Sequence, residues 1–191
     1  MSTSLLLLVA LGAVAVVVAG LARTRRKKGG SDGNVMKELR LRVLRDLPEG
    51  IGMAGKDEPL VVVMDIGFPN ATASVFAALT GDASLYLSGG GGVIGGIGHE
   101  NVRQAAIAFV RGSARYLDQM AATSDFPYPK PAHVRFYVRT RKAVYVAERL
   151  EKNLGEKRDA LWPLFYAGQN VLTELRTVAP DFGKPSSARP S

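Results

Sequence analysis

A glycine-rich segment, Gly89–Gly98, contains the residue types most suited to a binding site. Seven of its ten residues are glycine, so its backbone amides can approach a ligand closely. The segment leads into His99 and Glu100, where a long helix is predicted to begin. Free amides and the helix dipole favour anions there, so we expect phosphate chemistry, with His99 as a polar contact or general acid–base. The candidate ligand-binding residues are Gly90, Gly91, Gly92, Gly95, Gly96, Gly98 and His99.

A structural role for these glycines is the favoured alternative. The G-x-G-x-x-G spacing occurs, but it is almost automatic in so glycine-rich a segment, and the βαβ context that it needs does not follow. Glycines also permit positive φ angles and close packing. Three apolar residues inside the segment, Val93, Ile94 and Ile97, indicate a loop folded against a hydrophobic surface. We therefore favour structure or partner contact over a small-molecule site, and a helix cap over catalysis for His99.

Outside this segment, the sequence offers few residues suited to catalysis or metal binding. The sequence has no cysteine and two histidines, His99 and His133. Cysteine nucleophiles, thiolate zinc sites and multi-histidine metal centres are thereby excluded. Asp65 lies within an apolar strand, and we expect it to be exposed near the end of that strand. No catalytic residue, metal or cofactor is assigned, and a non-enzymatic protein is favoured.

A second cluster is basic and aromatic. Alternation from His133 to Thr140 places Arg135, Tyr137 and Arg139 on one side of a strand, followed by Arg141 and Lys142. A platform for single-stranded nucleic acid combines these residue types. A solvated sheet face whose arginines protect an edge is the favoured alternative, so nucleic acid is not expected as a partner.

The N-terminus predicts a membrane anchor. Residues 4–22 are uncharged and mostly apolar, which is the length that a helix needs to cross a bilayer. The basic residues that follow, Arg23, Arg25, Arg26, Lys27 and Lys28, favour the cytoplasmic side and attract anionic lipid. We expect an uncleaved single-pass anchor in a bacterial inner membrane, with the N-terminus outside and the domain cytoplasmic. A cleaved signal peptide and an exported protein remain the alternative.

The net charge of +8 belongs mainly to this tether. Residues 1–45 carry nine basic and two acidic residues, giving +7, whereas residues 46–191 carry sixteen and fifteen, giving +1. A nearly neutral domain argues against a nucleic-acid-binding face. The expected organisation is an anchor at 1–22, a basic and glycine-rich linker at 23–33, one domain at 34–178 and a disordered tail at 179–191.

The periodicity of the domain predicts an α+β fold. Helices are expected at 35–46, at 99–120 and after a cap at Asp159, and five strands are expected at 60–66, 72–79, 83–88, 133–140 and 144–148. Short turns between the first three strands indicate an antiparallel meander. The order is helix, three strands, helix, two strands, helix, which predicts a mainly antiparallel five-stranded sheet with helices packed on it.

The chain resembles two groups of known domains. In element count the chain resembles the profilin, roadblock and longin group of small adaptor domains. The strings 85–88 through 98–100 and 134–138 also resemble an uncharacterised bacterial domain that would cover about residues 34–178. The first resemblance implies an interaction domain, and neither implies a catalytic residue. We therefore expect a membrane-anchored module that presents the glycine segment or a sheet face to a protein, with phosphate-ligand binding or enzymatic activity as the alternative.

Overall fold

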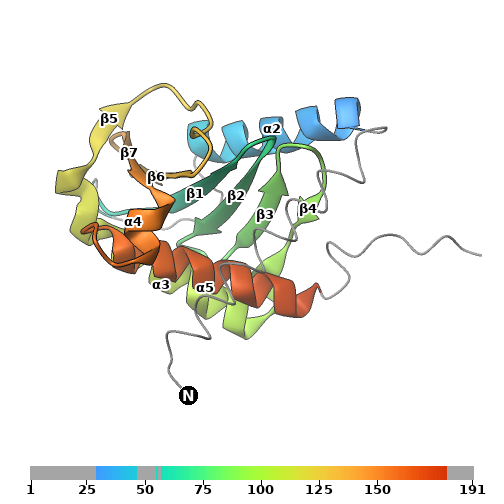
Figure 1. Cartoon of the computed structure of the whole chain (residues 1–191). Coiled ribbons are helices and arrows are strands. Elements are labelled where there is room, and N and C mark those ends of the chain that lie inside the picture. Colours follow the sequence, from blue (N-terminus) through green and yellow to red (C-terminus); the bar gives the residue numbers. More distant parts are fainter. Residues whose placement is uncertain (1–28, 47–54, 56, 180–191) are drawn as a thin grey trace, which may run out of the picture.

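The computed structural model describes residues 29–46, 55 and 57–179 (Figure 1). Its elements, in chain order, are α2 (Gly29–Arg45), β1 (Val61–Phe68), β2 (Ala71–Ala78), β3 (Ala83–Leu87), β4 (Gly92–Val93), η1 (Gly96–Gly98), α3 (Glu100–Ser113), η2 (Ala114–Gln119), β5 (Ala121–Thr123), β6 (His133–Arg139), β7 (Val144–Leu150), α4 (Glu151–Gly155) and α5 (Trp162–Val178). The predicted α+β class is confirmed.

All the described strands form one antiparallel sheet in the order β4-β3-β2-β1-β6-β7-β5. The expected meander of β1, β2 and β3 is confirmed, with short turns at 69–70 and 79–82. The chain then crosses to the other side of β1, where β6 pairs with it from Val61↔Arg139 to Ile66↔Val134. β1 and β6 are therefore central strands.

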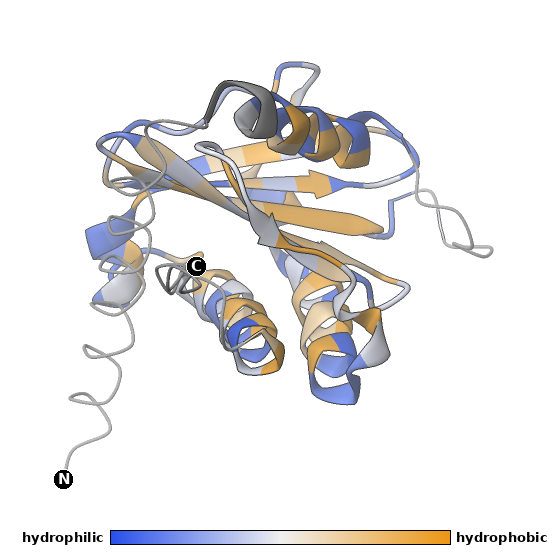
Figure 2. Ribbon diagram, turned by 90° about the vertical axis from the view of Figure 1, so that its right-hand side faces the viewer, coloured by the Kyte–Doolittle hydropathy of each residue, from blue (hydrophilic) through white to orange (hydrophobic). Residues whose placement is uncertain are grey.

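Helices cover both faces of the sheet (Figures 1 and 2). α2 lies on one face, and α3 and α5 lie side by side on the other. Because side chains alternate along a strand, β1 sends Val62 and Met64 towards α3 and α5, and Val61 and Val63 towards α2. This explains why β1 is apolar on both faces.

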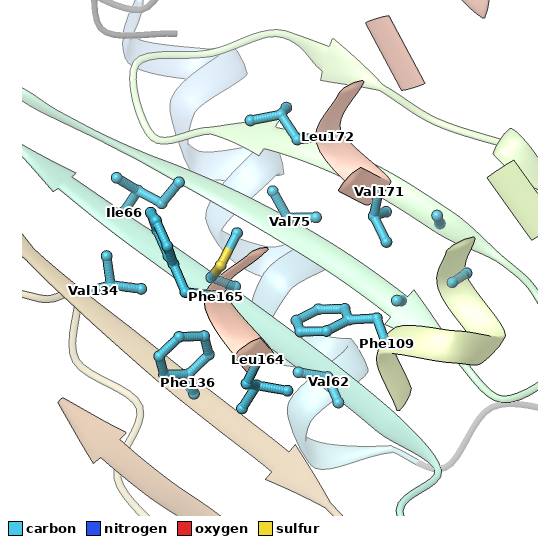
Figure 3. Packing of buried hydrophobic residues seen from close by; sticks show 14 of the residues in the cluster. Val62, Ile66, Val75, Phe109, Val134, Phe136, Leu164, Phe165, Val171 and Leu172 are labelled. Carbon is cyan, nitrogen blue, oxygen red and sulfur yellow. The ribbon is translucent and has the colours of Figure 1, made fainter. Parts of the chain in front are cut away.

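The larger core lies between the sheet and the α3–α5 pair (Figure 3). Phe109 of α3 and Phe165 of α5 are fully buried there with Phe136 of β6. Apolar residues of α5 and the residue before it are also buried there: Leu161, Leu164, Phe165, Val171, Leu172 and Leu175. Close packing of α5 also depends on Gly168, where a Cβ would meet Met64 Sδ at 2.6 Å.

The expected number of five strands is wrong, because the sheet has seven. The two additional strands, β4 and β5, have two and three residues. Strands so short carry too few residues for an alternating pattern, so only their pairing with β3 and β7 defines them. β4 lies inside the glycine segment, and β5 begins directly after the end of the helix that was expected at 99–120.

Helix boundaries also differ from expectation. α3 ends at Ser113 and continues as the 3₁₀ helix η2. α2 begins at Gly29, inside the expected linker. None of the described helices is long and apolar enough to span a membrane. The expected anchor at 1–22, the basic residues at 23–28 and the expected tail beyond Ala179 lie outside the described residues.

Candidate functional site

The glycine segment forms the β3–β4 hairpin and the entry to α3. Its tight turn is closed by hydrogen bonds from Gly90 N to Leu87 O (2.9 Å) and from Leu87 N to Gly91 O (3.0 Å). Gly90 and Gly91 have φ angles of 100° and 87°. Since side chains other than glycine rarely adopt such angles, these two glycines are required by the turn itself.

Two further glycines are required by close packing. A Cβ at Gly92 would overlap the carbonyl oxygen of Leu85 on the neighbouring strand. A Cβ at Gly96 would lie 2.6 Å from Val102 Cγ1 and 2.9 Å from Leu175 Cδ2, so Gly96 is the point where η1 meets α3 and α5. Both glycines have a structural role that accounts for their presence.

The rest of the segment is more open. Nothing lies within 4 Å of a Cβ built at Gly95 or Gly98, and Gly95 has a φ of 84°. Val93 packs against the larger core, as expected. In contrast, Ile94 and Ile97 are 62% and 45% exposed. These two side chains therefore do not pack against the domain itself, and their contact with a hydrophobic surface of a partner stays a prediction.

His99 is the residue that precedes α3, and its side chain is exposed and makes no capping hydrogen bond. Next to it, the Glu100 carboxylate accepts hydrogen bonds from Arg103 Nε (2.8 Å) and Gln104 Nε2 (2.7 Å). These bonds, Arg103 first, lower the pKa of Glu100 to about 2. A carboxylate in the first turn occupies the position that an anion would favour, so its charge opposes a phosphate ligand.

The hydrogen bonds of Glu100 predict an unusually low pKa for its carboxyl group. We expect the Glu100 carboxyl to titrate with a midpoint near pH 2, because Arg103 and Gln104 stabilise its ionised form. The interaction would contribute stability above the ordinary glutamate pKa and lose that contribution as the pH falls through the lowered value. NMR of the carboxyl carbon measures the midpoint. Arg103→Gln should raise it towards 4.5, and an unchanged midpoint would contradict the assignment.

A cluster that the sequence did not reveal lies beneath α2. Arg40 and Asp65 are 1% and 0% exposed, and their side chains form an ion pair. Arg40 Nε donates to Asp65 Oδ1 (3.1 Å) and Oδ2 (3.0 Å), and Arg40 Nη2 donates to Oδ2. The expectation that Asp65 is exposed is therefore wrong. Asp65 lies in the middle of the central strand, on the face that α2 covers.

The same arginine holds the proline-rich loop 124–132 against the sheet. Arg40 Nη1 donates to the carbonyl oxygen of Phe126 (2.8 Å). The carbonyl oxygen of Pro127 accepts from Tyr137 Oη (2.7 Å) and Arg135 Nη1 (3.0 Å). Since a proline-rich loop has few amides of its own with which to pair, side chains from α2 and β6 supply its hydrogen bonds.

Charge alternates across the strands of this face. Asp65 of β1 stands opposite Arg135 of β6, and Arg135 stands opposite Glu148 of β7. Arg135 forms an ion pair with Glu148, and Arg40 covers Asp65 from α2. Two positive and two negative groups therefore balance in a region with little solvent. We call Arg40, Asp65, Arg135 and Glu148 the charged row.

Aromatic rings complete the cluster. The guanidinium carbon of Arg40 lies 4.5 Å from the ring centroid of Tyr128 and 5.3 Å from that of Tyr137. Burial opposes the charge on Arg40, but Asp65 favours it, and the net effect is a raised pKa. Burial also raises the pKa of Tyr137. Arg40 therefore remains charged and Tyr137 remains a donor at neutral pH.

The basic strand is not an edge or a solvated face. β6 lies between β1 and β7, and Tyr137 is fully buried. Arg139 Nη1 donates to the carbonyl oxygen of Leu44 (2.8 Å) near the end of α2, which suits an arginine at a helix C-terminus. A platform for single-stranded nucleic acid needs accessible aromatic rings, and Tyr137 does not provide one.

The charged row can position α2 and the loop, but its geometry does not suit catalysis. Arg40 and Asp65 are inaccessible and already paired with each other. Within the part of the chain that the structure describes, no group of three His, Cys, Asp or Glu side chains is arranged to hold a metal ion. Position in the predicted helix could have revealed Arg40, since it lies between Met36 and Leu44 on the apolar side.

Fold and site together define a small α+β domain whose sheet is covered on both faces and whose N-terminal helix is fastened by buried charge. Comparisons with protein-family models, curated proteins and solved structures give no significant match. A proposal for its function therefore depends on the surfaces that remain open.

Proposed function

We propose that this chain is a membrane-anchored interaction module. Residues 1–22 anchor it in the inner membrane, the basic residues 23–28 contact anionic lipid, and the domain binds a protein partner on the cytoplasmic side. The length and apolar character of 1–22 support the anchor, and the basic residues that follow support the orientation. The sheet faces are covered by α2 and by α3 with α5, so the partner surface must lie elsewhere.

The observation that carries the proposal is the open edge of β5. β5 is the last strand in the sheet order, and within the described residues only β7 pairs with it. Ala121 and Ala122 are exposed. Edge strands are commonly protected from pairing with another chain by shortness, charge, a proline or a bulge. β5 has three residues, all small and uncharged, so its shortness is its one protection of this kind. This strand therefore suits the addition of an extended segment from a partner.

The charges beside β5 indicate which kind of partner segment would bind there. The exposed acidic residues Asp118 and Asp125 flank β5. A partner segment with basic residues at its ends would complement them and associate faster. The alternative, a phosphate-bearing ligand at Gly98 and His99, is less favoured because the ionised Glu100 lies beside them.

The experiment is site-specific photocrosslinking from full-length protein in native membranes. A crosslinker at Ala122 should capture one discrete partner, and a crosslinker at the exposed Asn170 of α5 should not. Adding Ala121→Lys should reduce the yield about tenfold, which corresponds to about 1.4 kcal/mol of binding, because a charged side chain on an edge disfavours strand addition. Thr173→Lys, on the exposed side of α5, is the matched control. Equal yields from the two crosslinker positions would contradict the proposal.

A further inference from the structure

Three of the large exposed hydrophobic residues among those described belong to elements on one side of the domain. Among the described residues, four large hydrophobic side chains are exposed: Val35, Ile94, Ile97 and Leu150. Val35 lies in the N-terminal half of α2, and Ile94 and Ile97 lie in the segment from β4 to η1. We call these three residues the apolar rim. Leu150 lies at the end of β7, far from β4 in the sheet order.

The apolar rim lies where the chain enters the domain. A Cβ at Gly33 of α2 would be 2.9 Å from the carbonyl oxygen of Ser88, at the β3–β4 turn. The N-terminal half of α2 and the strand β4 lie on the same side of the molecule (Figure 1), and this side faces the viewer in Figure 2. The glycine segment is therefore beside the first turns of α2.

The short segment before α2 limits the distance between the apolar rim and the proposed anchor at 1–22. α2 begins at Gly29, so six residues, 23–28, separate it from the end of the apolar segment. Even a fully extended chain of that length spans only about 20 Å. If residues 1–22 cross the bilayer, the N-terminus of α2 must be close to the lipid head groups, and the neighbouring glycine segment with it.

We propose that the apolar rim inserts into the interface of the membrane that anchors the chain. This inference depends on the proposed anchor and adds an orientation to it: the β4 edge faces lipid, and the β5 edge faces away.

The residue types suit this interface. The segment 88–98 contains no ionisable side chain, and Glu100, the first acidic residue after it, is paired with Arg103. Burying Ile94 and Ile97 among acyl chains and head groups therefore requires no unpaired charge to lose its water. Apolar side chains beside Lys and Arg are the combination that binds an anionic membrane surface, and here 23–28 supply the basic residues. A lipid surface is favoured over a protein partner at this edge because the short tether already holds it there.

Tryptophan fluorescence in vesicles tests the orientation. The only tryptophan, Trp162, is first replaced by phenylalanine, and Ile94→Trp then places the reporter at the apolar rim. The full chain is reconstituted in phosphatidylcholine–phosphatidylglycerol vesicles with or without brominated acyl chains. Bromine should quench the reporter by about half, since an inserted side chain lies at the acyl boundary. Ile97→Trp in the same background provides a second reporter.

Leu150→Trp is the matched control, because Leu150 is also exposed (46%) and β7 is about 24 Å from β4 across five strand spacings. Its emission should not depend on bromination. Emission from position 94 that is equally bright in both vesicles would overturn the inference. Protection of that reporter from both bromine and aqueous iodide would also overturn it, because a second copy or another protein would then cover the loop.

Failure of the anchor is separable from failure of the orientation. An alkaline carbonate wash should leave the full chain in the vesicles. If the wash releases the protein, the proposed anchor is wrong and the orientation falls with it. If the protein is retained but the reporter at position 94 is not quenched, the anchor stands and only the orientation is wrong.

Discussion

Replacing Arg40 by alanine is expected to lower the free energy of unfolding by about 3–5 kcal/mol. The substitution would leave the Asp65 carboxylate in the interior without its counter-ion. It would also remove the donor to the carbonyl oxygen of Phe126. Since a domain of this size is stable by only about 5–15 kcal/mol, the loss would be visible as a large shift in a urea unfolding curve followed by circular dichroism.

The exposed arginine at position 42 provides a matched control on the same helix. Among the described residues, the Arg42 side chain pairs with Asp46 at 3.8 Å in a solvent-exposed ion pair, and such pairs contribute little. Arg42→Ala should therefore change the stability by less than about 0.5 kcal/mol. If Arg40→Ala cost no more than Arg42→Ala, the charged row would not be what holds α2 to the sheet.

A double-mutant cycle separates the ion pair from the other bonds of Arg40. Asp65→Ala alone should also be strongly destabilising, because it leaves a buried guanidinium. The double variant should cost less than the sum of the single variants, by about 1–3 kcal/mol. Strict additivity would mean that Arg40 acts mainly through the carbonyl oxygens of the loop and not through Asp65.

The five longer strands were predictable because their patterns are local. The long alternation from His133 to Thr140 and the β-branched run of β1 each define a strand without reference to the rest of the chain. The placement of β6 beside β1 was not predictable in this way. That pairing joins residues far apart in the sequence, and it places Arg135 and Tyr137 under α2 and the loop 124–132, where Tyr137 is buried and Arg135 is partly buried.

Arg40 and Asp65 were missed for a related reason. Each breaks a local rule, because an arginine on the apolar side of a helix and an aspartate inside an apolar strand are both unfavourable alone. Only the packing of α2 across β1 brings the two side chains together, so that each charge is buried beside its counter-ion. In the glycine segment the need for glycine was predictable, but the exposure of Ile94 and Ile97 depends on where β4 pairs.

Gly67→Ala is expected to destabilise the domain by about 1–3 kcal/mol, as overpacking at a site that cannot relax typically does. A Cβ at Gly67 would overlap the carbonyl oxygen of Lys130 and lie 3.2 Å from that of Pro129. These are backbone atoms, so the loop 124–132 as a whole would have to move away from β1. Gly89→Ala is the matched control, since nothing lies within 4 Å of its added Cβ, and it should be nearly neutral.

Hydrogen exchange would show whether the loop is the part that moves. The amide of Ala132 donates to the carbonyl oxygen of Gly67 (2.9 Å), so its exchange should accelerate in Gly67→Ala and remain unchanged in Gly89→Ala. Combining Gly67→Ala with Arg40→Ala should destabilise the domain by less than the sum of the two, because both substitutions release the same loop. Additive effects would instead show that the loop contacts β1 and α2 independently, and that Arg40 holds only the helix.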